Sequence, residues 1–408
     1  MKCRHCKNFL KHVFIDLGFA PPSNAYLSAE DLHKPEFYFP LKVFACENCG
    51  LVQTEDYTPA DELFRDDYAY FSSTSTSWLD HAARYSSMIR KRLNLDEQSF
   101  VIEIASNDGY LLKNFVAAGI PCLGIEPTGG TADAAEKLSI PVMREFFGTA
   151  LGKELARQGR QADLIIGNNV YAHVPDINDF TGGLKAALKD GGTVTLEFPH
   201  VMRLIGRTQF DTIYHEHYSY LSLFTVTRIF KSEGLRVFDV EELSTHGGSL
   251  RVYGCHTGDP RPTTEAVSAI IAEEERHGLR KPETVRAFQK RAAHIKDDLV
   301  LFLIEQKRLG KKVAAYGAAA KGNTLLNYAG IKPDLISYVC DAAPSKQGKF
   351  LPGSHIPIVS PEVLKEQKPD TILILPWNIA GEIVEQHDYV KEWGGGFAVA
   401  VPEMEMLR

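Results

Sequence analysis

The chain lacks the features that mark membrane and secreted proteins. No apolar run approaches the roughly 18 residues that a membrane-spanning helix needs. The N-terminal stretch MKCRHCKNFLKHVF is basic, but it has neither a long apolar segment nor a small-residue cleavage site, so it does not predict a secretory signal. We therefore expect a cytoplasmic protein with no membrane partner.

An excess of positive charge is also absent. The sequence has 45 Lys and Arg residues against 52 Asp and Glu, which gives a formal net charge of −7. This balance offers no electrostatic support for nucleic acid as a partner. Apolar residues at 44% and charged residues at 24% are typical of a folded chain, and 408 residues predict two or three domains.

The sequence has few cysteines, and their number is uneven. Seven cysteines in a reducing compartment argue against a disulfide framework. Four of them form two CxxC pairs, which are Cys3 with Cys6 and Cys46 with Cys49. Two such turns can surround one tetrahedral Zn²⁺ with four thiolates and leave no open position, so we predict a structural zinc ion. Four ordinary thiols are the alternative, and a redox pair is disfavoured because neither CxxC lies at a strand-to-helix junction.

The hydrophobic pattern divides the chain into three parts. Residues 1–75 are predicted to form a small β-rich zinc-binding domain, and residues 76–257 alternate strands and helices as a doubly wound parallel sheet does. The expected strands are 100–104, 122–126, 162–168, 193–198, 235–240 and 249–255, and the expected helices include 109–117, 130–138, 147–158, 177–189 and 223–233. Residues 258–408 begin with a charged helical segment, interrupted near 277–282, and end in a second α/β pattern. The predicted fold is therefore α/β with two Rossmann-like domains after the zinc module.

The first strand-to-helix turn of the central part is VIEIASNDGYLL. It places Glu103 at the end of a strand and puts Ala105, Asn107 and Gly109 in the turn. In a parallel sheet this turn usually faces the ligand, but a single glycine does not make the glycine-rich fingerprint of dinucleotide enzymes. The pyrophosphate of NAD is thus poorly supported here, and a dehydrogenase is the least favoured class.

Polar residues end the neighbouring strands. Glu126 lies at the tip of the next strand, where a carboxylate can accept hydrogen bonds from both ribose hydroxyls of an adenosyl ligand. A later strand ends in Asn168 and Asn169, which line the same crevice. Each of these residues alone is more often a helix cap. As an ordered set they favour S-adenosylmethionine as the cofactor.

Histidine and tyrosine gather in the segment TIYHEHYSYLS. It carries Tyr214, Glu216 and His217 beyond the end of a predicted strand, and His173 lies in an earlier loop. Imidazole exchanges protons near neutral pH, so this density of acid–base groups indicates a catalytic site more than a set of structural histidines. The HEH spacing fits no common metal motif.

The segment STHGGSLRVY adds two candidate substrate ligands. Arg251 has the charge to hold a phosphate or carboxylate, and His246 precedes a glycine pair that allows close backbone approach. A β-hairpin with a surface arginine is an equally good interpretation of the same residues.

The C-terminal half offers a candidate site for a nucleotide diphosphate. Gly317, Ala318 and Lys321 lie at a strand-to-helix junction, and Lys346 follows in a loop rich in glycine and proline. Small residues let a ligand approach the backbone, and a helix start favours an anionic group. A packing turn beside a solvated basic loop is the alternative.

The order of these motifs resembles the bacterial nucleotide-sugar C-methyltransferases over essentially the whole chain. The matching segments are the cysteine pairs, EIASNDGYLL, NVYAHVPD, TIYHEHYSYLS, HGGSLRVY and YGAAAKGNTLLN. The resemblance implies an S-adenosylmethionine methyltransferase domain between a zinc domain and a C-terminal Rossmann-like domain that helps to bind a nucleotide sugar, with TDP expected. Its active-site positions are Tyr68, His173, Tyr214, Glu216 and His217.

The implied reaction is methylation of a carbon next to the C4 ketone of a deoxysugar. We expect His217 to be the base, with Glu216 fixing its orientation or tautomer and Tyr214 or His173 donating a hydrogen bond to the enolate oxygen. An O- or N-methyltransferase and a non-catalytic zinc scaffold that binds adenosyl ligands remain as alternatives. The sequence leaves open the oligomeric state and the choice between C3 and C5, with C3 favoured.

Overall fold

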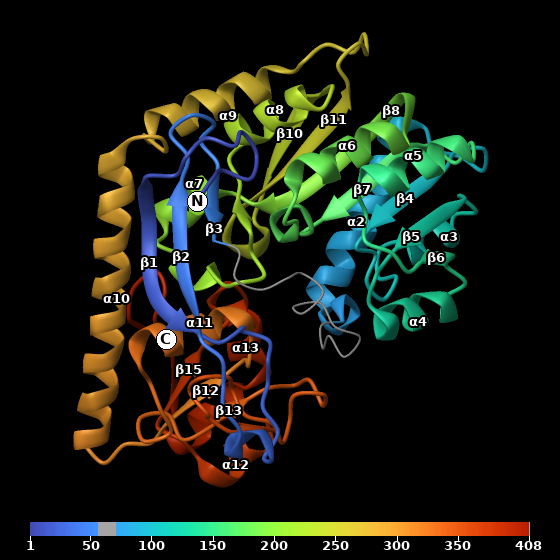
Figure 1. The fold of residues 1–408 in the computed structure, drawn as a ribbon. Helices are drawn as coiled ribbons and strands as arrows, with labels where there is room; N and C mark the ends of the chain where they lie inside the picture. Colours follow the sequence, from blue (N-terminus) through green and yellow to red (C-terminus); the bar gives the residue numbers. More distant parts are fainter. Residues whose placement is uncertain (56–70, 408) are drawn as a thin grey trace.

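The computed structural model describes residues 1–55 and 71–407. Three β-sheets follow one another along the chain, and helices accompany the second and third sheets (Figure 1). This arrangement confirms the predicted α/β fold with a small β-rich N-terminal part. None of the helices in these residues is both long enough and apolar enough to cross a membrane.

The N-terminal sheet takes one of its strands from far along the chain. Its strands β1 (His12–Ala20), β2 (Phe39–Ala45) and β3 (Val52–Thr54) are antiparallel neighbours. The fourth strand, β9 (Ser219–Tyr220), pairs with β3 and ends the segment that carries the histidine cluster. The predicted division at residues 75 and 257 stays a prediction, because this sheet joins residues from both of the first two parts.

The central sheet has seven strands in the order β10-β11-β8-β7-β4-β5-β6. In chain order these are β4 (Val101–Ile104), β5 (Cys122–Ile125), β6 (Val142–Met143), β7 (Ala162–Asn168), β8 (Leu188–Pro199), β10 (Leu235–Leu243) and β11 (Ser249–His256). Strand β4 lies between β5 and β7 and is parallel to both, so the strand order reverses there. At such a point the connecting turns leave a crevice at the carboxyl ends of the strands.

Six α-helices connect and cover these strands. They are α2 (Thr76–Leu93), α3 (Lys113–Val116), α4 (Gly129–Lys137), α5 (Thr149–Arg157), α6 (Ile177–Ala187) and α8 (Leu223–Ser232). A further short helix, α7 (Val201–Gly206), follows β8 directly. The helix predicted at 109–117 is only one turn long, and Gly109, where the prediction began it, has a left-handed φ of 78°.

The C-terminal part begins with two helices, α9 (Glu265–Arg276) and α10 (Pro282–Arg308). The predicted break between them is confirmed, and Gly278 has a left-handed φ of +66° that suits the end of a helix. The third sheet has the order β14-β13-β12-β15-β16-β17. Its elements are β12 (Val313–Tyr316), α11 (Ala320–Ala329), β13 (Val339–Cys340), β14 (Ile358–Val359), α12 (Val363–Gln367), β15 (Thr371–Ile374), α13 (Ala380–Gln386), β16 (Gly396–Val399) and β17 (Glu405–Leu407).

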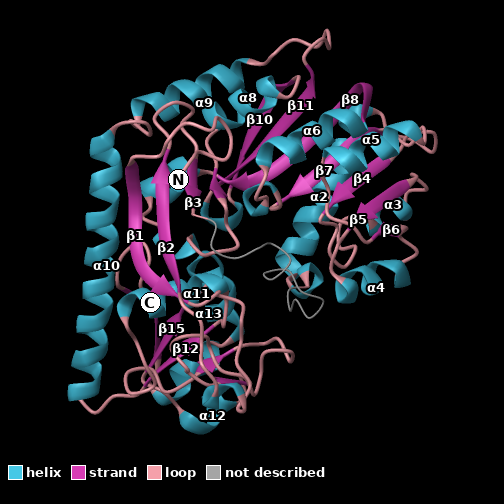
Figure 2. Ribbon diagram, viewed as in Figure 1, coloured by secondary structure: helices cyan, strands magenta, loops and turns pink. Residues whose placement is uncertain are grey.

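One apolar core joins the first and third sheets. It contains Phe14 and Val43 of the N-terminal sheet, Phe210 and Ile213 of the histidine segment, and side chains of α10 and of the C-terminal sheet. Helix α10 runs beside β1 (Figure 2), and the rings of Phe14 and Phe288 pack with centroids 4.9 Å apart. The histidine segment is thus held between the zinc-binding and C-terminal parts.

Candidate active site and metal centre

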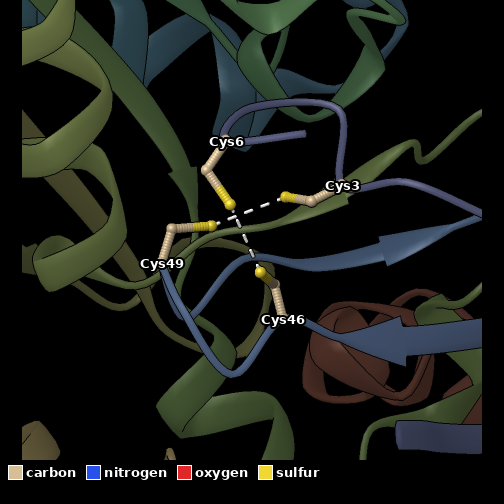
Figure 3. Close-up of side chains that lie close together, drawn as sticks. All are labelled: Cys3, Cys6, Cys46 and Cys49. Carbon is tan, nitrogen blue, oxygen red and sulfur yellow. Dashed lines mark hydrogen bonds between the residues drawn. The ribbon is translucent and has the colours of Figure 1, made fainter. Parts of the chain in front are cut away.

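The four N-terminal cysteines converge on one point, as predicted (Figure 3). Their sulfur atoms all lie within 4.8 Å of one another, and the Sγ atoms of Cys3 and Cys49, like those of Cys6 and Cys46, are 3.5 Å apart. Zn–S bonds of 2.3 Å in a tetrahedron put neighbouring sulfurs about 3.8 Å apart, so this spacing fits zinc. Four protein sulfurs leave no position for substrate, and the site is structural.

The local backbone explains why the two turns present their thiols together. Residues Lys7 and Gly50, which follow the two pairs, have left-handed φ angles of 59° and 78°. The Lys7 and Gly50 amides donate to the carbonyls of Cys3 and Cys46, at 3.0 and 2.9 Å, and close each turn. The Gln53 side-chain amide also donates to the Cys3 sulfur at 3.2 Å, which favours the thiolate form that binds metal.

The turn after β4 has an unusual backbone. Ala105, Asn107 and Gly109 have φ angles of 55°, 52° and 78°, so every second residue is left-handed. Only glycine adopts this geometry without cost, yet two of the three positions carry side chains. At the third position a Cβ would lie 2.4 Å from the Ile140 Cδ1 atom, so glycine is required there. The turn therefore has the shape of a glycine-rich loop although the sequence shows one glycine.

Two buried carboxyl groups flank this turn. Burial, followed by the negative charges of Asp108 and Glu126, raises the pKa of Glu103 well above its usual range. Glu126 accepts hydrogen bonds from the Asn107 and Thr128 backbone amides, both at 2.9 Å, which fixes its carboxylate at the tip of β5. The Thr128 amide and hydroxyl occupy one oxygen, and the other accepts the Asn107 amide and keeps a lone pair, so Glu126 has the capacity to accept a ribose hydroxyl; this role stays a prediction.

Asn168, at the end of β7, provides unused hydrogen-bonding capacity. It is buried, and neither its amide nitrogen nor its amide oxygen has a partner among the described residues. Its neighbour Asn169 has a left-handed φ of 54°, and its side-chain nitrogen lies 2.9 Å from the Nε2 atom of His246. A buried amide without a partner costs free energy unless a ligand or water satisfies it. The residues at the carboxyl ends of β4, β5 and β7 thus fit a polar cofactor.

The histidine cluster centres on His217. Its Nδ1 atom lies 2.8 Å from the Thr212 carbonyl oxygen, and its Nε2 atom lies 2.8 Å from the Tyr214 hydroxyl. Burial and then the neighbouring His173 ring lower the pKa of His217 well below 6.5. The imidazole is therefore neutral at pH 7, with its proton on Nδ1.

His173 packs edge-on against His217, with ring centroids 4.6 Å apart. Its Nδ1 atom lies 2.8 Å from the Glu216 carbonyl oxygen, and burial lowers its pKa to about 4. The Glu216 carboxyl group does not orient His217 as we expected: both His217 nitrogens have other partners, and Glu216 accepts a hydrogen bond from Asn24 at 3.1 Å. Glu216 lies inside a turn that the His217 amide closes on the Tyr214 carbonyl at 2.9 Å, and its side chain meets Asn24 of the N-terminal part instead of the His217 ring.

The C-terminal part contributes a lysine to the same region. Burial lowers the pKa of Lys321, and its positive charge in turn contributes to the lowered pKa values of His217 and His246. Its Nζ atom lies 2.6 Å from the Asn378 side-chain oxygen and 4.7 Å from the centroid of the Trp377 ring. The structure thus brings Lys321 and His246 close to the histidine cluster.

The other residues expected to bind a diphosphate face inward. The Ala318 amide donates to the Asp341 carboxylate at 2.7 Å, and the Lys346 ammonium donates to the Ala318 carbonyl at 2.9 Å. Gly317 has a φ of +91°, and a Cβ there would lie 2.4 Å from Pro376. We expected the Ala318 amide to bind an anionic group of a ligand, but it donates to the Asp341 carboxylate at the end of β13. At Ala318 the turn therefore serves packing within the C-terminal part, which was the alternative interpretation of its sequence.

Arg251 does not lie where we expected an arginine that holds a phosphate or carboxylate of the substrate. It is 4% exposed and lies inside the central sheet, where its guanidinium pairs with Glu197 at 2.8 Å and Glu241 at 3.2 Å. It also lies 4.5 Å over the Tyr85 ring. Its charge is neutralised by carboxylates of neighbouring strands, so Arg251 is a structural ion-pair residue and does not hold substrate.

Sequence reasoning missed several residues of the site. Glu197, at the end of β8, accepts hydrogen bonds from His81 and from the Thr245 hydroxyl, both at 2.9 Å. Asp211 immediately precedes the histidine segment and accepts a hydrogen bond from the Trp377 indole at 2.7 Å. Burial raises the pKa of Asp211 to about 6. For Glu197 the sequence offered one signal, which is an acidic residue near the end of the predicted strand TVTLEF.

Tyr68, which the resemblance placed in the active site, lies outside the described residues.

Models of three protein families match this chain. They are a zinc binding domain over residues 3–64, a methyltransferase domain over 78–240 and a C-methyltransferase C-terminal domain over 244–402. The C-methyltransferase NovU of Streptomyces niveus is 34% identical over 406 residues, which cover 100% of this chain and 96% of that protein. The chain belongs to the C-methyltransferase family. The resemblance seen in the motifs is thereby confirmed, and this C-methyltransferase uses S-adenosylmethionine and carries a structural zinc site.

Two solved methyltransferases that resemble this chain each cover less than half of it. The magnesium protoporphyrin IX methyltransferase of Synechocystis, solved with S-adenosylhomocysteine, is 14% identical with a TM-score of 0.35, over 44% of this chain and 83% of that chain. The glycopeptide N-methyltransferase MtfA, solved with S-adenosylmethionine, is 11% identical with a TM-score of 0.34, over 43% of this chain and 94% of that chain. The family assignment therefore rests on the family models and the full-length relative.

Proposed function

We propose that this C-methyltransferase methylates the carbon next to the C4 ketone of a nucleotide-linked deoxysugar, with TDP as the nucleotide and C3 as the carbon. The observation that carries the proposal is the neutral, half-buried imidazole of His217, whose Nε2 atom has its lone pair available to a proton donor. C-methylation needs an acidified carbon, and a ketone makes the neighbouring C–H acidic enough for such a base.

Proton removal is the first step. Substrate displaces the Tyr214 hydroxyl from Nε2 of His217, which then takes the proton from the carbon next to the ketone. The Thr212 carbonyl stabilises the resulting imidazolium through Nδ1–H, which lies 2.8 Å away. The low pKa of His217 favours return of the proton, so the enolate forms in small amounts and is consumed by methyl transfer.

The enolate oxygen needs a hydrogen-bond donor. The displaced Tyr214 hydroxyl is suited to this role, because it already lies at the reacting nitrogen. His173 donates from Nδ1 to the Glu216 carbonyl at 2.8 Å, so its neutral form offers only an accepting nitrogen to substrate. We therefore favour Tyr214 over His173 as the donor, although both were candidates from sequence. The Lys321 charge adds to the stabilisation of any anion in this region.

The cofactor residues position the methyl donor. S-adenosylmethionine supplies an already activated sulfonium methyl group, so the protein has to orient it and to exclude water. We assign Glu126 to the ribose, and the backbone of residues 105–109 and the Asn168 amide to the polar groups of the cofactor. We assign Glu103 to the cofactor as well, because it is buried at the end of β4 and neither oxygen of its carboxyl group has a hydrogen-bond partner among the described residues.

The nucleotide part of the substrate is assigned to Lys321 and His246, which face the same region from two different sheets. Lys346 and the turn at Gly317 pack next to Lys321 in the C-terminal part, where the Lys346 ammonium donates to the Ala318 carbonyl.

An O- or N-methyltransferase would need a base but no enolate, and the family description argues against it. The test is incubation with S-adenosylmethionine and a panel of 4-keto and 4-hydroxy sugar nucleotides. NMR should show a new C-methyl on the ketosugar only, whereas a methyl on oxygen or nitrogen would refute the proposal.

A further inference from the structure

One short strand joins the zinc site to the histidine cluster. Strand β3 follows the second CxxC pair and places Gln53 opposite Ser219 of β9. The Gln53 amide donates to the Cys3 sulfur at 3.2 Å, and the Thr54 hydroxyl donates to the His217 carbonyl at 3.1 Å. A metal ligand and the backbone of His217 thus contact adjacent residues of β3.

Arg4, inside the first CxxC pair, makes a second connection. Its guanidinium donates to the Thr54 carbonyl at 3.0 Å and to the Pro175 carbonyl at 2.7 Å. It also lies 5.2 Å over the ring of Tyr218, the residue that follows His217. Pro175 comes two residues after His173, so one buried arginine of the zinc turn contacts both histidine-bearing segments.

The cofactor loop is held by other elements. Residues 105–109 are bonded to Glu126 at the end of β5 and to the short 3-10 helix η2 (Ser72–Thr74) that precedes α2. The Ser72 and Ser73 amides donate to the Asn107 and Asp108 side chains at 2.9 and 3.0 Å. The zinc turns therefore contact the part of the site that removes the proton, whereas η2 and the end of β5 hold the part that binds the cofactor.

We propose that the zinc site positions the base, with Arg4 and Thr54 as positioning residues that hold the His217 and His173 segments in place. The proposal rests on the proposed function, in which His217 removes the proton. Short CxxC turns keep their shape through the metal, and loss of zinc frees the Arg4 and Gln53 contacts that fix β3. The orientation of His217 then depends on an ion that never touches the substrate.

Amide hydrogen exchange of the full chain, zinc-loaded and after chelation, tests the structural part without any substrate. Loss of zinc should deprotect peptides from 212–222 and leave peptides from 101–126 protected, with the S-adenosylmethionine Kd changed less than twofold. Unchanged protection of 212–222 would overturn the proposal. Equal loss in both regions would also overturn it, because zinc would then stabilise the whole fold without a specific effect on the base.

Variants of Thr54 test the catalytic part. The readout is exchange of the substrate proton next to the ketone with solvent deuterium, measured by NMR. Thr54→Val removes one hydrogen bond to the loop and should slow this exchange about 5–10-fold. Thr54→Ser keeps the hydroxyl and should restore the rate to within twofold.

The matched control is Thr227→Val, which removes a threonine hydroxyl that donates to the Phe224 carbonyl at 2.8 Å in α8, away from the loop. Its exchange rate should equal that of wild type. Wild-type exchange in Thr54→Val, together with lost exchange in His217→Asn, would overturn this proposal alone. Wild-type exchange in His217→Asn would overturn the proposed base, and this proposal with it.

Discussion

The Nδ1 atom of His217 lies 2.8 Å from the carbonyl oxygen of Thr212, five residues earlier in the same loop. A carbonyl oxygen can only accept, so Nδ1 carries the ring proton and Nε2 carries the lone pair. The tautomer is thus set by local backbone and not by a carboxylate. The Thr324 hydroxyl of α11 holds this loop too, because it donates to the Ile213 carbonyl at 2.8 Å.

Acid should destabilise the fold between pH 6.5 and pH 4. Burial lowers the pKa of His173 and of His246 to about 4. Their neutral forms therefore contribute stability that is complete above the unfolded pKa of 6.5 and is lost as the pH falls toward the folded value. Each adds a slope of up to about 1.4 kcal/mol per pH unit to the free energy of unfolding.

Urea unfolding at pH 7, 6 and 5 measures this slope. In His246→Gln the dependence should be shallower than in wild type by roughly the contribution of one proton. The matched variant is His294→Gln, which changes an exposed side chain of α10 and should leave the slope as in wild type. An unchanged slope in His246→Gln would contradict a lowered pKa of the imidazole at this position.

Loss of the Tyr214 hydroxyl should impair catalysis more than binding. Tyr214→Phe removes the group that we assign to the enolate oxygen, and kcat should fall roughly 100-fold. The S-adenosylmethionine Kd, measured by calorimetry, should stay within twofold. Tyr338→Phe is the control, because that hydroxyl is buried without a partner among the described residues. A wild-type kcat in Tyr214→Phe would remove Tyr214 from the mechanism.

Lys321→Met should weaken sugar-nucleotide binding. A charge-assisted hydrogen bond to phosphate is lost, so KM for the sugar nucleotide should rise about 10–100-fold with an unchanged S-adenosylmethionine Kd. Lys307→Met makes the same charge change at an exposed pair with Asp334 and should leave KM unaltered. If both variants kept the wild-type KM, the nucleotide would bind elsewhere.

Glu197→Gln should destabilise the central sheet. Burial alone would raise the pKa of Glu197, but the His81 hydrogen bond and the Arg251 charge lower it, so the carboxylate is ionised. Its loss leaves buried Arg251 without its nearest partner and should cost about 3–5 kcal/mol in denaturant unfolding at pH 7. Glu154→Gln, at an exposed pair with Arg157, should leave the denaturant midpoint close to that of wild type.

The combination of Glu197→Gln with Arg251→Met gives a further check. Removing both charges should recover part of the stability that the single Glu197 change loses, because no unpaired charge remains buried. A purely additive result would mean that the two side chains do not interact in solution, contrary to their 2.8 Å contact.

The parts of the fold that depend on local pattern could be predicted. The CxxC spacing identified all four zinc ligands, since two thiols in one tight turn are a local feature. The apolar run at 162–168 matches β7 residue for residue, because a strand buried on both faces reads as a continuous apolar run. The break between α9 and α10 followed from Gly278 and Pro282 in the same way.

Features that depend on distant residues could not be predicted. Arg251 pairs with Glu197, which is separated from it by 54 positions in the sequence, and no local pattern predicts that pair. Strand β9 has two residues, which is too short for a period-two pattern, so its place in the zinc-bearing sheet was missed. The left-handed angle at Ala105 opposes residue preference, although Asn tolerates the one at Asn107, and the sequence argument considered only the missing glycines.

Exchange of the substrate proton with solvent deuterium tests the central claim most directly. A TDP-linked 4-keto-deoxysugar is incubated in D₂O with wild type or His217→Asn, without S-adenosylmethionine, and the proton next to the ketone is followed by NMR. Our account predicts exchange catalysed by wild type and exchange lowered to background in His217→Asn, with S-adenosylmethionine binding retained. Exchange at the wild-type rate in His217→Asn would contradict the assignment of His217 as the base.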